Sequence, residues 1–146
     1  MTGSEDHGKP PQPAQLATLE RDGWELDSSV ARHKESPDTF WIPTAKARSS
    51  IVPTDFVKLI FLVTQQDEEQ GEVVVGERLW VKVEGSSGPY FWGTLANDPS
   101  FDGSSIGLMF GAALVFLPEH IVAIMNADEQ QKQERAADAR AKKRRT

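Results

Sequence analysis

The sequence predicts a β-dominated α+β fold: a small, strongly bent antiparallel sheet or partly open SH3-like barrel, with one or two short helices and a C-terminal helical tail. Two observations predict it. Between residues 53 and 125, four or five short apolar runs are separated by turn residues. Residues 78–84 (RLWVKVE) alternate between apolar and polar side chains, as a half-buried strand does. The strands are too few for an immunoglobulin-type sandwich.

The helices are expected in the first part of the chain. Residues 16–24 (LATLERDGW) predict a short helical turn that ends at Gly23. Residues 39–42 predict a short β-type run. Residues 44–51 (TAKARSSI) predict one or two helical turns, with Thr44 as the N-cap because its hydroxyl can accept a backbone N–H.

The strongest strand signal is the run at residues 56–63 (FVKLIFLV), which is nearly all apolar and therefore predicts a strand covered on both faces. Residues 65–71 predict a polar loop, and Gly76 is expected to interrupt the next strand. In the alternating run that follows, one face is formed by Leu79, Val81 and Val83.

The remaining strands are short. Residues 85–89 predict a hairpin loop, and residues 90–95 (YFWGTL) the returning strand, with Gly93 at a bulge or a close approach. Further strands are predicted at 114–117 and 121–125, with a short turn between them.

The chain of 146 residues suits a single domain with two polar ends. Residues 1–15 contain three prolines and two glycines, and we expect them to form a disordered leader. Residues 16–125 are expected to form one β-rich domain. Residues 126–146 are strong helix formers without an apolar stripe, so they predict a charged tail that is helical or disordered.

Composition excludes several classes of protein. The chain has no cysteine, which excludes a disulfide scaffold and thiolate metal sites. No apolar run reaches the ~20 residues of a membrane helix, and no export signal is seen, so we expect a cytoplasmic protein that does not engage membranes. Residues 1–125 carry 9 Lys/Arg and 18 Asp/Glu, so nucleic-acid binding is not expected of the body.

The tail has the opposite charge balance, with 7 Lys/Arg and 4 Asp/Glu in residues 126–146. Its basic end is the one place where nucleic acid is a candidate partner. It consists of Arg140, Lys142, Lys143, Arg144 and Arg145. A solvated tail, or one attracted to the acidic body, explains the same charges.

Several phrases of the body resemble a known family. They are FVKLIF at 56–61, GERLWVKV at 76–83, GTLANDP at 93–99 and PEHI at 118–121. In order and spacing, residues 38–125 resemble a small bacterial family known only as a domain of unknown function (number 2314). The family often has Gly-Asp before its strands, where this chain has Thr54-Asp55 and Gly111-Ala112, and residues 103–107 look like an insertion. The resemblance implies a fold and its extent, but no reaction.

Catalytic and metal-binding patterns are nearly absent from the sequence. The three histidines show no metal-ligand spacing, so no metal or other cofactor is expected. The serines lie in turn contexts, and neither Gly/Ser-rich loop has a P-loop ending. If the protein is an enzyme without a recognisable motif, its polar candidates are Arg48, Glu77, Asn97, Glu119 and His120.

Aromatic residues supply the candidate binding surface. Trp80 lies on the polar face of its strand, while Tyr90 and Trp92 share one face of the next strand. If the two tryptophans are exposed, they form a recognition surface of interface-type residues; if a segment covers them, they form a second core. The candidate partner-binding residues are Trp41, Arg78, Trp80, Lys82, Tyr90 and Trp92.

We therefore expect a binding module and not an enzyme, with a protein or peptide partner, in the style of an inhibitor- or immunity-like bacterial protein. The alternatives are an enzyme that lacks a recognisable motif and a nucleic-acid accessory protein that acts through the basic tail.

Overall fold

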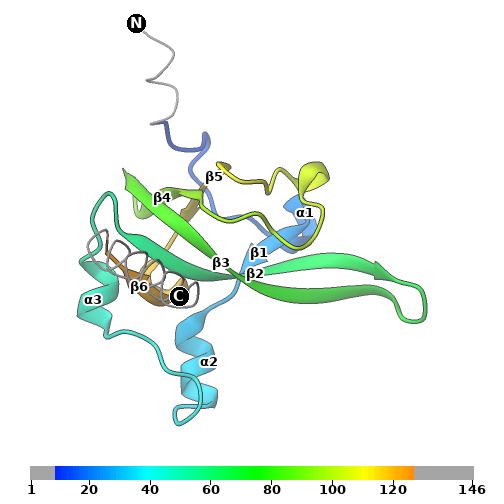
Figure 1. Cartoon of the computed structure of the whole chain (residues 1–146), viewed down its shortest axis with the longest axis horizontal. Coiled ribbons are helices and arrows are strands. Elements are labelled where there is room, and N and C mark those ends of the chain that lie inside the picture. The colour runs from blue at the N-terminus through cyan, green and yellow to red at the C-terminus, as the bar shows by residue number, and fades with distance from the viewer. Residues whose placement is uncertain (1–8, 127–146) are drawn as a thin grey trace, which may run out of the picture.

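The structure, a computed structural model, describes residues 9–126. Its elements follow one another as α1 (Leu19–Asp22), β1 (Trp24–Leu26), α2 (Ser29–Glu35), α3 (Ala45–Ser49), β2 (Phe56–Asp67), β3 (Gly71–Ser87), β4 (Tyr90–Leu95), the 3₁₀ turn η2 (Ser104–Ile106), β5 (Ala113–Phe116), the 3₁₀ turn η3 (Pro118–His120) and β6 (Ile121–Met125). Figure 1 shows the strands curling around one another with the short helices at the periphery.

The strands form one antiparallel sheet in the order β1-β2-β3-β4-β5, and β6 returns to pair with β2. Strand β2 pairs with β3 along one of its edges. Its other edge is shared between β6, at Phe56–Leu59, and β1, at Phe61–Val63. Within residues 9–126, β5 and β6 are joined through η3 without pairing to each other, so the barrel stays open there. The predicted β-dominated α+β fold, a strongly bent antiparallel sheet or partly open barrel with short helices, is confirmed.

The core lies inside the curl and follows the predicted alternation. Leu79, Val81 and Val83 are buried on β3, and they face the equally buried Val57 and Phe61 of β2. Every second residue of each strand points to this side. Burying these side chains removes apolar surface from water, which supplies most of the energy that holds so small a sheet.

Beyond the barrel, β2 and β3 continue as a two-stranded arm that projects far from the body (Figure 1). Their pairing extends from Phe56 opposite Lys82 to Asp67 opposite Gly71. The polar loop predicted at residues 65–71 is therefore mostly strand, and Gly76 does not interrupt β3. The sequence gives the reason: apolar residues recur at 73–75 and can pair across the arm with residues 63–65.

Several other predicted boundaries are corrected. Residues 39–42 form no strand, residues 85–87 belong to β3, and β1 and α2 were not predicted at all. Strand β1 is three residues long and exists because it pairs with β2, while Trp24 packs on Phe61 with ring centroids 5.6 Å apart. Such a strand has no local signal, since its stability comes from residues far along the chain.

The predicted helix ends are confirmed. The hydroxyl of Thr44 accepts a hydrogen bond from the backbone N–H of Ala47 at the start of α3. Helix α1 ends at Gly23, whose φ of 82° is a left-handed conformation that glycine adopts without strain. The predicted close approach at Gly93 is also confirmed, because a Cβ there would lie 2.2 Å from the carbonyl oxygen of Lys82.

The ends of the chain are described in part. Residues 9–15 of the predicted leader contain no helix or strand, and several of them line a hollow together with residues 113–115 of β5. Residues 1–8 and the tail from residue 127, with its basic end, lie outside the described residues. No helix among residues 9–126 is long and apolar enough to span a membrane.

Candidate functional site

The six aromatic and cationic candidates do not form one surface. Trp92 is buried, with 4% of its surface exposed, so it is removed from the candidate contact residues. Its indole nitrogen lies over Gly85, 3.1 Å from where a Cβ would be. Tyr90 is half-buried at the β3–β4 turn, opposite Ser87.

Strand register explains why Trp80 and Trp92 do not lie side by side. Trp92 pairs with Gly85, next to a β-bulge between Val83 and Gly85. Trp80 lies at the far end of the same hairpin, where its carbonyl accepts the N–H of Ala96. The bulge and the hairpin register therefore separate the two side chains along the hairpin.

The outer face around Trp80 is partly covered by cationic side chains. The ammonium group of Lys58 lies 4.9 Å from the centre of the Trp80 ring, and the guanidinium of Arg78 lies 5.3 Å from the centre of the Phe40 ring. Lys82, exposed on the same face, pairs with Thr94. Cation–π contacts of this kind contribute about 0.5–1 kcal/mol at exposed sites, so they stabilise the face modestly.

Trp41 is the exposed tryptophan of the four. It retains 75% of its surface and borders a groove of about 320 Å³ between the segment before β2 and the edge of β6. The groove is lined by Trp41, Pro43, Ala47, Ser50, Ile51, Asp55, Ala123, Ile124 and Asn126. Asp55 is the charged residue among them. We call this feature the Trp41 groove.

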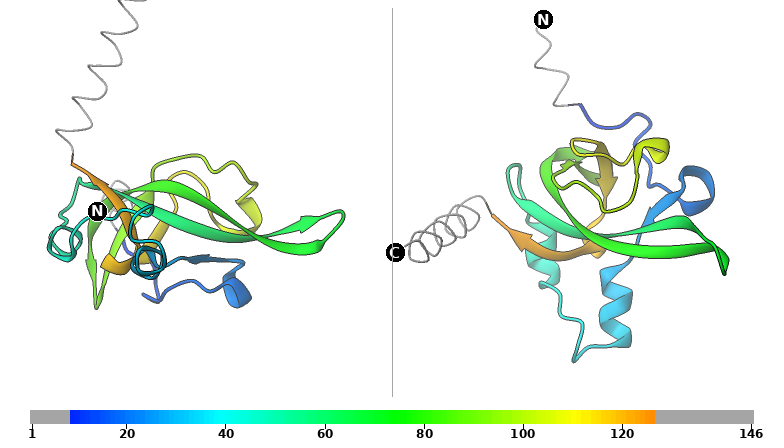
Figure 2. Two further views of the ribbon diagram at one scale, coloured as in Figure 1. Left: turned by 90° about the horizontal axis from the view of Figure 1, so that it is seen from below. Right: turned by 45° about the vertical axis from the view of Figure 1, so that its right-hand side comes forward.

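The groove follows a free strand edge. Among the described residues, β6 pairs with β2 alone, and it lies at the outer margin of the sheet, on the other side of the barrel from the arm (Figure 2, right). The carbonyl of Ile121, at its start, accepts the hydroxyl of Ser29. Residues 122–125 of this edge carry no charge, and charge is one of the devices that prevent strand addition.

The five polar candidates do not converge on one pocket. Glu77 accepts hydrogen bonds from the backbone and hydroxyl of Ser100, and Asn97 accepts the N–H of Trp80 at 2.6 Å. Both therefore hold the loop after β4 against β3. Arg48, Glu119 and His120 lie near η3, on a different part of the barrel.

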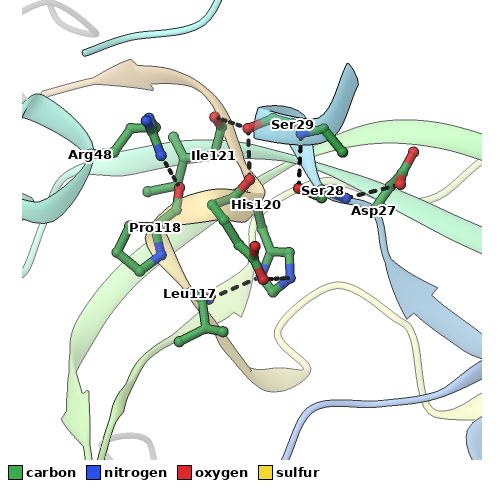
Figure 3. A network of polar contacts seen from close by, with 10 residues as sticks. Asp27, Ser28, Ser29, Arg48, Leu117, Pro118, His120 and Ile121 are labelled. Carbon is green, nitrogen blue, oxygen red and sulfur yellow. Dashed lines mark hydrogen bonds and ion pairs between the residues drawn. The ribbon is translucent and has the colours of Figure 1, made fainter. Parts of the chain in front are cut away.

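Around η3 the polar groups form a connected network (Figure 3). The hydroxyl of Ser29, itself fully buried, lies 2.8 Å from the carbonyl oxygen of Glu119 and 2.7 Å from that of Ile121. Arg48 donates to the carbonyl of Pro118 at 3.3 Å. These contacts fasten α2 and α3 to the turn between β5 and β6, which is a positioning role.

His120 is the buried titratable group of this network, with 5% of its surface exposed. Its Nδ1 accepts the backbone N–H of Leu117 at 3.0 Å (Figure 3). Burial lowers the pKa of His120, and the carboxylates of Glu119, Asp27 and Glu25 oppose that shift. The ring is therefore neutral at pH 7 and serves as a hydrogen-bond acceptor for the end of β5.

No group of His, Asp and Glu side chains within residues 9–126 is arranged to hold a metal ion. No family model matches this chain, and comparison with characterised proteins and with solved structures finds no match. The resemblance of residues 38–125 to the domain family stays a prediction.

Sequence reasoning named Trp41 and missed the rest of its groove. The missed residues come from α3, from the turn before β2 and from β6, which meet only because β6 pairs with β2. The one available signal was Trp41-Ile-Pro43, an aromatic residue and a proline in the segment for which the sequence predicted a short β-type run.

Proposed function

We propose that this protein is a binding module that captures an extended, basic segment of a partner protein in the Trp41 groove. The observation that carries the proposal is the 75% exposure of Trp41 beside an apolar groove. Tryptophan is among the residues that dominate binding interfaces, and here its exposed ring stands beside a groove that can receive a partner's side chain.

The free edge of β6 supports an extended segment as the occupant. Alternate residues between 122 and 125 direct their backbone groups away from β2, where these groups are available for ladder hydrogen bonds, while the groove beside the edge receives a side chain. Strand addition of this kind draws affinity from main-chain hydrogen bonds and specificity from side-chain pockets.

Charge supports a basic partner. Asp55 is the charged residue in the groove, and residues 1–125 as a whole carry an excess of acidic side chains. A field of one sign speeds the association of oppositely charged partners and disfavours acidic ones. An acidic module that occupies a basic partner is the inhibitor-like role that composition suggested.

The test uses a synthetic peptide of alternating valine and lysine. Its binding is followed by the amide NMR signals and the hydrogen exchange of residues 122–125. We expect saturable shifts and slowed exchange at this edge. We expect Trp41→Ala to weaken binding about 30-fold, which corresponds to a 2 kcal/mol hot spot.

The control variant is Phe110→Ala, because Phe110 is also a large exposed side chain, with 66% of its surface exposed, and lies in the loop before β5. It is expected to bind like wild type. The control peptide carries glutamate in place of lysine. Equal binding of both peptides, or unchanged exchange at residues 122–125, would show that the groove does not take a basic strand.

A further inference from the structure

A small pocket separate from the Trp41 groove lies between the N-terminal segment and η3. Its volume is about 190 Å³, and it is lined by Leu16, Ala17, Thr18, Glu25, Leu26 and His120. We call it the His120 pocket. At about 30 Å³ for each water-sized group, the space accommodates roughly six non-hydrogen atoms.

His120 lines this space, and its ring carries a hydrogen-bond donor. Because Nδ1 accepts the N–H of Leu117, the neutral ring carries its proton on Nε2. The closest acidic oxygen to Nε2 is Oε1 of Glu119 at 3.7 Å, which is beyond hydrogen-bond distance. Within residues 9–126, every completely buried side-chain nitrogen or oxygen has a hydrogen-bond partner. Because Nε2 has no such partner, it is not completely buried, and the pocket is the open space that His120 lines.

Glu25 contributes an acceptor to the same pocket. One of its carboxylate oxygens lies 3.4 Å from the backbone N–H of Leu19, a long contact, and the structure gives the other oxygen no partner among the described residues. The walls between the two polar groups include the apolar side chains of Leu16 and Leu26.

Electrostatics selects the ligand. The carboxylates of Glu119, Asp27 and Glu25 act to raise the pKa of His120, so the electrostatic potential at the ring is negative and an anion is repelled. A cation offers donors only, and it would leave the Nε2–H of His120 facing another donor. A neutral group with one acceptor and one donor satisfies both ends of the pocket.

We infer that the His120 pocket binds a carboxamide, whose carbonyl accepts the Nε2–H of His120 and whose NH₂ donates to Glu25. The carbon chain of the ligand packs on Leu16 and Leu26. The side chain of a partner's asparagine or glutamine and a small free amide share this chemistry. The inference does not depend on the Trp41 groove.

The test titrates the full-length protein with propionamide, propionate and propylammonium, observing the His120 ring signals and the amide of Leu117 by NMR. The Leu117 amide reports on the ring directly because it is hydrogen-bonded to Nδ1. We expect saturable shifts with propionamide, in the millimolar range suited to so small a ligand, and no saturation with the two ions.

Two variants locate the site. Leu16→Trp is expected to fill the pocket and abolish the propionamide shifts. Gln15→Leu adds apolar bulk at an exposed neighbour outside the pocket and is expected to leave them unchanged. Saturation by propionate, shifts that rise linearly without saturating, or unaltered binding in Leu16→Trp would overturn the inference.

A peptide arm identifies the source of the amide. A short peptide with a central glutamine is compared with the same peptide carrying leucine. Tighter binding of the glutamine peptide than of propionamide assigns the pocket to a partner's side chain, and the reverse order assigns it to a free small amide.

Discussion

Ser29 joins α2 to the turn that carries His120, and its removal gives a sharp test of the structure. The side chain is completely buried, and its single hydroxyl lies within 2.8 Å of two backbone carbonyl oxygens, those of Glu119 and Ile121. Ser29→Ala removes the donor and leaves both acceptors in a position that water does not reach freely.

The expected cost follows from the contacts. Leaving a buried acceptor without its donor costs about 1–3 kcal/mol, and the better helix propensity of alanine returns a few tenths of that. We therefore expect Ser29→Ala to lower the free energy of unfolding by about 2 kcal/mol. For a domain of this size the melting temperature falls by about 4 °C per kcal/mol, so by about 8 °C.

The two serines that flank this helix are matched controls. The hydroxyl of Ser28 caps α2 by accepting the N–H of Ala31, so Ser28→Ala is expected to cost about 1 kcal/mol. Ser36 is exposed at the other end, and its substitution by alanine is expected to cost less than about 0.5 kcal/mol. Urea unfolding of the three variants measures the order. If Ser29→Ala lowers the free energy of unfolding no more than Ser36→Ala does, the hydroxyl contacts between Ser29 and the residues around η3 do not stabilise the fold.

Two further predictions concern backbone contact and pH. Gly93→Ala is expected to lower the free energy of unfolding in urea by more than about 3 kcal/mol, because its Cβ would lie 2.2 Å from a backbone oxygen. Gly76→Ala is the control that we expect to be tolerated, because its Cβ would meet only side chains, at 3.5 Å or more. Equal losses of stability in the two variants would contradict the β3–β4 register. The lowered pKa of His120 means that the unfolded chain takes up the proton first. Its contribution to stability is therefore complete above about pH 6.5 and is lost as the pH falls from there toward the lower folded pKa. Urea midpoints measured across this range should show a drop that His120→Asn, which does not titrate, lacks; an equal drop in that variant would assign the effect to other groups.

The strands of the barrel could be predicted because their signals are local. The alternation at Leu79, Val81 and Val83 fixes which side of β3 faces the core, and Thr44 has the capping hydroxyl that begins α3. Strand β1 and helix α2 escaped prediction, since each depends on a distant partner: β1 pairs with β2, and Ser29 of α2 bonds to the residues around η3.

For the candidate sites too, part could be predicted from the sequence and part depends on segments that are distant in the chain. Trp41 and His120 stand out in the sequence as residue types, one suited to binding and the other to proton chemistry. Their surroundings do not, because the Trp41 groove combines residues near 45, 55 and 124, and the His120 pocket combines residues near 17, 25 and 120. The exposure of the tryptophans also depends on register, which the bulge beside Gly85 changes.

By itself, the order of apolar and polar residues determined a bent antiparallel sheet and the side of β3 that faces the core, because side chains alternate along a strand whatever lies beside it. Only the tertiary structure decided that Trp92 is buried while Trp41 is exposed, and that His120 lines a pocket. The physical reason is that the exposure of a side chain and its contacts depend on which distant segments pack against it. Those segments come together only after the sheet has closed around its core.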